Sequence, residues 1–147
     1  MIKISTRAKY GLRAMIDIGV HSARGPVYLK DIAQRQEISM KYLDHIVTIL
    51  KTRGFVKNGA GGHGGYVLVL PAEELFVNEI VEALEGSLSP SGCADSEKNC
   101  KRSGRCVTRR LWQRVKEGIR EALSVRLSEL VESEKEIFSH GERVHYI

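Results

Sequence analysis

The sequence has few of the features that mark membrane or secreted proteins. No apolar run reaches the roughly eighteen residues that a transmembrane helix needs. The N-terminal stretch MIKISTRAKYGLRAM lacks the apolar core and small-residue cleavage site of a signal peptide. We therefore expect a cytoplasmic protein.

Cysteine is also scarce. The chain has three cysteines, and all of them, Cys93, Cys100 and Cys106, lie in the stretch GCADSEKNCKRSGRC. An odd number of thiols in a reducing compartment cannot form a complete set of internal disulfides. This favours metal, cluster or redox chemistry over structural bridges.

The rest of the composition is that of an ordinary folded domain. With 147 residues, 42% of them hydrophobic, the chain can bury one compact core with a small extension. The net charge of +5 favours a polyanionic partner, although many basic proteins have none.

Hydrophobic spacing predicts a mainly helical fold with one small β-hairpin. A first helix is expected to begin after Ser5 or Thr6 and to end at Gly25 and Pro26. Apolar residues at spacings of three and four give its expected inner face: Leu12, Met15, Ile16, Gly19, Val20 and Ala23.

Two further helices joined by a tight turn come next. Ser39 is the expected N-cap of the second, which runs to Arg53 and buries Leu43, Ile46, Val47 and Leu50. After Gly54, the strand-like runs FVKN and YVLVL flank the glycine-dense GAGGHGG and predict a hairpin. Residues 1–86 are therefore expected to form a winged helix-turn-helix domain, with the wing at 55–70.

The remaining chain is expected to alternate between helix and loop. Residues 73–85 have helical spacing, whereas 87–106 are rich in serine, glycine and charge and predict a loop. An apolar seam predicts one long helix over 107–131, followed by a charged tail at 132–147. Since the long helix exceeds what its own domain can cover, we expect a homodimer; the alternative is packing against its own chain.

The second helix of the pair is the expected reader of DNA. The major groove admits one helix, and basic side chains around it would hold the phosphates of double-stranded DNA with a roughly palindromic operator. The same order of elements also occurs in protein-interaction domains. The candidate DNA contacts are Ser39, Lys41, Asp44, His45, Lys57, His63, Arg7 and Lys9.

Four interpretations of the cysteines are open. The spacings C-x6-C and C-x5-C lack the C-x2-C knuckle typical of zinc sites. Nearby cations would lower thiol pKa values, as a thiol–disulfide switch requires, whereas inert cysteines prefer apolar surroundings. Three soft thiolates also suit an iron–sulfur cluster, which needs one more ligand for full coordination.

Several segments together resemble the Rrf2 family of bacterial transcription regulators. They are STRAKYGLRAM, GPVYLKDIAQRQEISMKYLDHIVTILKTRGFV, GGHGGYVL and the cysteine block ending in CVTRRLW. The resemblance is greatest to the IscR-like branch. It implies a winged-helix homodimer in which Cys93, Cys100 and Cys106 hold a 2Fe-2S cluster, with 4Fe-4S as the alternative. Cluster state would then control promoters of iron–sulfur assembly genes.

Other branches imply other signals, because NsrR-like members sense nitric oxide and RirA-like members respond to iron. The chain also departs from these patterns. Arg109 stands where the IscR-like branch has its histidine ligand, Lys9 where NsrR-like proteins have an aspartate ligand, and Ala60 where a wing arginine is expected. Asp44 matches a glutamate that contacts DNA. The fourth ligand is thus open among water, a small thiol, and Asp95, Glu97, Ser103, His45, His63 and Asp44.

Functions other than DNA binding under cluster control have less support in the sequence. No paired carboxylates or nucleophile–base pair lie near the loop, so we expect no enzyme. Two non-enzymatic functions also fit these residues: a cluster-free thiol switch, and an interaction module that does not bind DNA.

Overall fold

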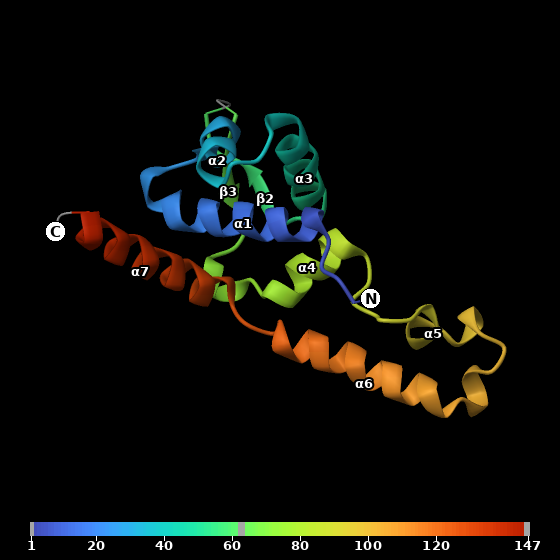
Figure 1. The fold of residues 1–147 in the computed structure, drawn as a ribbon. Coiled ribbons are helices and arrows are strands. Elements are labelled where there is room, and N and C mark those ends of the chain that lie inside the picture. The colour runs from blue at the N-terminus through green and yellow to red at the C-terminus, as the bar shows by residue number, and fades with distance from the viewer. Residues whose placement is uncertain (1, 62–63, 146–147) are drawn as a thin grey trace.

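A computed structural model of the chain describes residues 2–61 and 64–145, with side chains through residue 140. Helix α1 (Thr6–His21) lies across the middle of the molecule (Figure 1). Helices α2 (Leu29–Gln36) and α3 (Met40–Thr52) and a small sheet lie on one side of it. Helices α4 (Val77–Glu85) and α7 (Leu127–His145) lie on the other, and α6 (Val107–Ala122) extends away from this body.

Helix α1 begins where the sequence predicts. The Ser5 hydroxyl oxygen accepts the Ala8 N–H at 3.1 Å, which caps the helix. Its buried face is different from the predicted stripe, since Leu12, Ile16 and Val20 are only partly buried and Ala23 is exposed. The reason is that α3, α4 and α7 all pack on α1, so burial extends around the helix. The fully buried residues are Ala8, Gly11, Ala14, Met15, Asp17 and Ile18.

The predicted helix pair is confirmed. Helix α2 is followed by Glu37, whose φ of 54° turns the chain toward α3. The Ser39 hydroxyl oxygen accepts the Tyr42 N–H at 3.3 Å, and Arg53 ends α3. The four apolar residues expected to face inward are each completely buried: Leu43, Ile46, Val47 and Leu50.

The predicted hairpin consists of β2 (Val56–Asn58) and β3 (Gly65–Leu68), which pair antiparallel. A third strand that the sequence did not suggest, β1 (Val27–Tyr28), pairs with the other edge of β3, giving the order β1-β3-β2. A strand of two residues is too short to show an alternating pattern in the sequence. Glycine is needed at Gly65, because a Cβ there would overlap the Pro26 side chain.

The predicted helix over 73–85 is shorter than expected. Ala72–Glu74 form a separate 3-10 turn, and Leu75 is extended before α4 starts at Val77. The extended segment pairs with a distant part of the chain. The Val77 N–H donates to the Val125 carbonyl at 2.9 Å, and the Leu127 N–H donates to the Leu75 carbonyl at 2.8 Å.

This pairing explains why the prediction of one long helix over 107–131 was wrong. The chain forms two helices, α6 and α7, with a break at 123–126 whose backbone bonds to the segment before α4. After the break, Leu127 and Val131 enter the core under α1, at 0% and 4% exposure. Residues beyond 131, predicted to be a patternless tail, continue α7 to His145.

Candidate nucleic-acid interface and cysteine loop

The N-terminal half of α3 presents the predicted reader residues to solvent. Lys41, Asp44 and His45 are exposed, and the Thr48 hydroxyl donates to the Asp44 carbonyl at 2.7 Å. Ser39 precedes them and is occupied as the N-cap. The four residues therefore share the exposed start of the helix, where a recognition helix contacts base edges.

An ion pair between the buried Asp17 and the partly exposed Arg35 fixes this helix-turn-helix on α1. The Asp17 carboxylate, with a side chain 1% exposed, accepts Arg35 Nη2 at 2.7 Å and Arg35 Nε at 3.0 Å. Gln36 Nε2 donates to the same carboxylate at 3.0 Å. These bonds join α1 to the end of α2, and the hydrogen bond to Asp17 raises the pKa of Arg35 above its ordinary value. The only sequence signal for this network was an acidic residue among the apolar residues of α1.

The wing is tied to α3, the predicted reader helix. Lys51 Nζ donates to Asn58 Oδ1 at 2.6 Å, which links α3 to β2, and the predicted contact Lys57 is exposed beside it. Gly61 and Gly64 have φ values of 97° and 78°, which glycine adopts without strain. His63, another predicted contact, lies outside the described residues.

The two predicted contacts on α1 differ in their surroundings. Lys9 is exposed. Arg7 is half-buried, and its Nε donates to the Leu84 carbonyl at 2.8 Å, so it stabilises the end of α4. Arg7 also borders a cavity of about 390 Å³ together with His45 and Arg53. Arg7 therefore lies beside α3, and its bond to the Leu84 carbonyl gives it a structural role.

The segment 87–106, here called the cysteine loop, is more ordered than predicted. It contains the short helix α5 (Gly92–Asp95) and 3-10 turns at Glu97–Asn99 and Ser103–Arg105. The buried Ser103 hydroxyl donates to the carbonyls of Glu97 and Cys100 at 2.9 and 2.8 Å. Asn99 Nδ2 donates to the Gly92 carbonyl at 2.6 Å. Hydrogen bonds between side chains and backbone thus give the loop a defined path.

The three cysteines are free, half-buried thiols within this loop. Cys93 Sγ lies 3.1 Å from the Ser91 hydroxyl oxygen. Cys106 precedes α6, and its Sγ lies 3.1 Å from the Thr108 hydroxyl oxygen. The hydrogen bond from Thr108, the backbone N–H of Arg109 and the charge of Arg102 lower the pKa of Cys106 below its ordinary value. The thiolate, which is the form that ligates metals, is therefore favoured at Cys106.

The donor set fits an iron–sulfur cluster in kind, because cysteine thiolates are the usual ligands of such clusters and three cysteines lie in this loop. The thiols are not yet gathered: within residues 2–61 and 64–140, no three His, Cys, Asp or Glu side chains are grouped closely enough to hold a metal ion. Cluster binding would require the loop to bring the three thiols closer together.

The candidates for a fourth ligand have other partners or lie elsewhere. Asp95 bonds to Lys116 and Ser87, each at 2.8 Å, and the Lys116 bond is the main cause that lowers its pKa. Ser103 donates to carbonyls, and Glu97 lies 3.9 Å from Arg109. Asp44 and His45 lie on α3, away from the loop in Figure 1.

Comparison with known proteins identifies the family to which this chain belongs. Residues 4–133 match the Rrf2 family, described as an iron-dependent transcriptional regulator. The chain belongs to the Rrf2 family. It is 41% identical over 111 residues to protein rrf2 of Nitratidesulfovibrio vulgaris, covering 76% of this chain and 74% of that protein. It is 36% identical over 135 residues to the HTH-type transcriptional regulator IscR of Xenorhabdus nematophila, covering 91% and 82%.

Solved structures of Rrf2-like regulators confirm the winged helix-turn-helix fold. T. potens IscR superposes with a TM-score of 0.74 at 34% identity, covering 92% of this chain and 90% of that one. CymR, the global cysteine regulator of B. subtilis, gives 0.73 at 34% identity, covering 90% and 98%. The oxidized form of Staphylococcus aureus CymR gives 0.69 at 33% identity, covering 88% and 96%.

Membership of the Rrf2 family settles the class of function. The chain is a DNA-binding transcription regulator and not an enzyme. Across the described residues of this Rrf2 regulator, no helix has the length and apolar character needed to cross a membrane.

Proposed function

We propose that this Rrf2 regulator binds an iron–sulfur cluster through Cys93, Cys100 and Cys106, and that cluster state controls its affinity for promoters. The observation that carries the proposal is the concentration of all three thiols in one self-bonded loop at the start of α6. A 2Fe-2S cluster is the expected type, with 4Fe-4S as the alternative, and iron–sulfur assembly genes are the expected targets.

The cysteine ligands would leave one cluster position to a ligand outside the three thiols. When bound, the cluster supplies a centre that responds to redox state and to ligand exchange. Cys106 contributes a thiolate favoured by its hydrogen bonds, and the cations of the loop offset the negative charge that three thiolates gather. A cluster held in this way can be lost or attacked without unfolding of the helical body.

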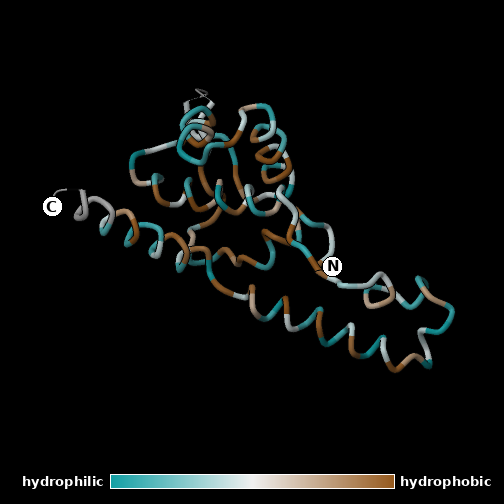
Figure 2. Tube along the Cα trace, in the orientation of Figure 1, coloured by the Kyte–Doolittle hydropathy of each residue, from teal (hydrophilic) through white to brown (hydrophobic). Residues whose placement is uncertain are grey.

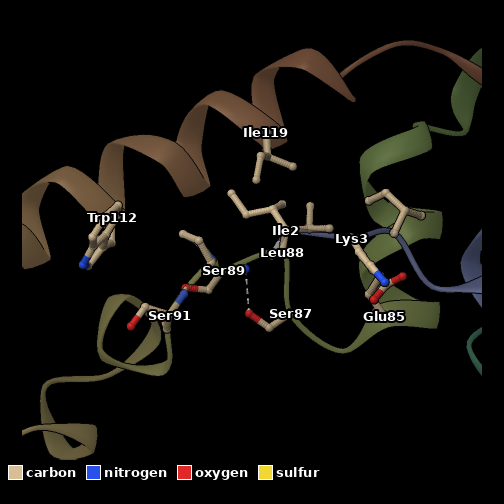
Figure 3. Close-up of a pocket in the computed structure, with 11 residues that line it drawn as sticks. Ile2, Lys3, Glu85, Ser87, Leu88, Ser89, Ser91, Trp112 and Ile119 are labelled. Atoms are coloured by element: carbon tan, nitrogen blue, oxygen red, sulfur yellow. Dashed lines mark hydrogen bonds between the residues drawn. The ribbon is translucent and has the colours of Figure 1, made fainter.

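The exposed face of α6 supports a homodimer. None of residues 107–122, all of which are described, is fully buried in the single chain, although hydrophobic residues recur along the helix (Figure 2). Val107, Leu111 and Trp112 are 80%, 48% and 37% exposed. Trp112 and Ile119 border a cavity of about 590 Å³ that Leu88 and Ile2 line from the opposite side (Figure 3). A second copy of α6 would cover this apolar face.

A series of contacts connects α6, which follows the cysteine loop, to the winged helix-turn-helix domain. Arg120 of α6 pairs with Glu82 of α4 through two hydrogen bonds of 2.8 and 3.0 Å. The end of α4 is held in turn by Arg7 of α1, on which the helix-turn-helix rests. A change in the loop that moved α6 would therefore change the spacing between the two DNA-binding domains of a dimer. That spacing determines how the dimer fits a palindromic operator.

We propose that the DNA contacts divide by role. Lys41, Asp44 and His45 would face base edges from α3, because all three are exposed near its start. Ser39, Lys9 and Lys57 would contact phosphates from the start of α3, from α1 and from the wing.

A thiol switch without a cluster is the second candidate. The lowered pKa of Cys106 favours it, since the thiolate is the form that attacks disulfides and oxidants. One solved structure of the similar Staphylococcus aureus CymR is of an oxidized form, which is consistent with a thiol switch. Nitric oxide or iron as the signal would leave the cluster proposal intact and change only what removes the cluster.

Promoter binding in the two cluster states tests the proposal. We expect the affinity for a target promoter fragment to differ by about tenfold between cluster-loaded and cluster-free protein, within the usual range of coupling. The triple variant Cys93→Ala, Cys100→Ala, Cys106→Ala should bind like cluster-free protein under both conditions. The measurement is an anaerobic fluorescence-anisotropy titration at fixed salt.

The control for this titration is Lys41→Ala, which should weaken promoter binding in both states while the protein still takes up its cluster. The proposal of cluster control is wrong if the triple variant binds each promoter as the wild type does in both states. Thiol control would show instead as a response to a disulfide-forming oxidant in protein free of iron.

A further inference from the structure

Arg109 reaches the cysteine loop from the first turn of α6. Its side chain is only 14% exposed, which is unusual for an arginine on a helix with no fully buried residue in its described length, 107–122. Arg109 Nε donates to the Cys93 carbonyl oxygen at 2.8 Å. Its Nη1 lies 3.9 Å from Glu97 Oε1 in the next turn of the loop. One guanidinium thus contacts the loop at two separate points.

The last cysteine lies at the start of the same helix. Cys106 directly precedes α6, and its thiol is 3.1 Å from the Thr108 hydroxyl oxygen. The Arg109 side chain therefore ties the Cys93 segment to the helix start that follows Cys106, although Cys93 is sixteen positions before Arg109 in the chain. Ser103 and Asn99 act differently, because their bonds tie the loop only to itself.

Arginine cannot act as a metal ligand at this position, because its guanidinium stays protonated and has no acceptor. It can donate several hydrogen bonds in a fixed plane and place a positive charge among three thiolates. Both properties suit a role in which Arg109 positions the ligands and is not itself a ligand.

We propose that Arg109 is a positioning residue for the cysteines: it holds the Cys93 segment of the loop against the start of α6 before a cluster binds. The inference rests on the proposed role of the three thiols as ligands. It implies that the loop is arranged in advance in the cluster-free protein, so that only part of the ordering remains to occur when the cluster is taken up.

The test uses the cluster-free full chain, so it does not depend on cluster loading. Alkylation of each cysteine by iodoacetamide is followed by mass spectrometry, and amide hydrogen exchange is followed over 92–106. In Arg109→Ala, we expect Cys93 to react about tenfold faster, since loss of a charged hydrogen bond to a partly buried carbonyl favours local opening by that factor. Exchange should rise in the same segment.

Two variants control for charge. Arg110 is exposed, and among the described residues its side chain forms no hydrogen bond or ion pair. Arg110→Ala should therefore change the Cys93 rate by less than about twofold. Arg109→Lys keeps the charge and one donor group, so it should recover part of the protection of Cys93. Cys106 should change little in all three variants, because its contact with the Thr108 hydroxyl remains.

The positioning role is wrong if Arg109→Ala leaves Cys93 reactivity and exchange unchanged, or if Arg110→Ala has the same effect. Cluster uptake gives an independent reading: Arg109→Ala should recover less visible absorbance after reconstitution than Arg110→Ala. If the wild type bound no cluster while the labelling difference persisted, the proposed function would fail and the loop-positioning role of Arg109 would stand.

Discussion

The Asp17→Ala variant is expected to lose about 2–3 kcal/mol of unfolding free energy. Asp17 is buried under the helix-turn-helix and accepts three hydrogen bonds from Arg35 and Gln36. Removal of one member of a buried pair leaves its partners without an acceptor, which costs about 3–5 kcal/mol when both are fully buried. The expected loss is about 2–3 kcal/mol because the Arg35 side chain is 35% exposed and can be partly hydrated.

Urea denaturation followed by circular dichroism, at one fixed protein concentration, measures this loss. Asp44→Ala is the matched control, because it removes an exposed carboxylate from the same region and should change stability by less than about 0.5 kcal/mol. Equal stability of the Asp17 and Asp44 variants would mean that the ion pair does not hold the helix-turn-helix on α1. Weaker promoter binding by Asp17→Ala below its unfolding transition should accompany the loss.

The Leu127→Ala variant should lose about 3 kcal/mol of unfolding free energy. Leu127 is completely buried, so its truncation leaves a cavity in the core. Leu127 is the first residue of α7 and enters the core just after the break between α6 and α7. Its loss should also increase hydrogen exchange in α7, because the helix would lose its main anchor under α1. Thermal or urea unfolding, together with exchange measurements, tests both expectations.

Ile137→Ala provides the control within the same helix. Ile137 is 66% exposed, so its truncation should cost less than about 0.5 kcal/mol. If Leu127→Ala were no more destabilising than Ile137→Ala, α7 would not be docked as described.

Sequence patterns predicted the elements whose burial is local. The spacing of Leu43, Ile46, Val47 and Leu50 identified α3, and Ser39 and Gly54 marked its ends, because helix periodicity and capping depend on neighbours within a few residues. The hairpin was predicted for a similar reason, since a glycine-dense turn between two short apolar runs is itself a local signal.

The features that were missed depend on distant partners. The break before Leu127 follows from its pairing with Leu75, more than fifty positions earlier, while the apolar seam continues through it. Asp17 finds Arg35 eighteen positions away, and β1 exists only because β3 offers it an edge. In the candidate site, the cysteines were identified from composition, but the bond of Arg109 to Cys93 required the fold.

The most direct test of the central claim is the metal content of the protein. Anaerobic purification, visible absorption, and iron and sulfide analysis should be carried out on the wild type and on Cys106→Ala. We expect charge-transfer absorption with about two iron and two sulfide per wild-type chain, both lost in the variant. Wild-type protein that stays colourless after reconstitution with iron and sulfide would contradict the cluster proposal. It would leave an Rrf2 regulator controlled through its thiols alone.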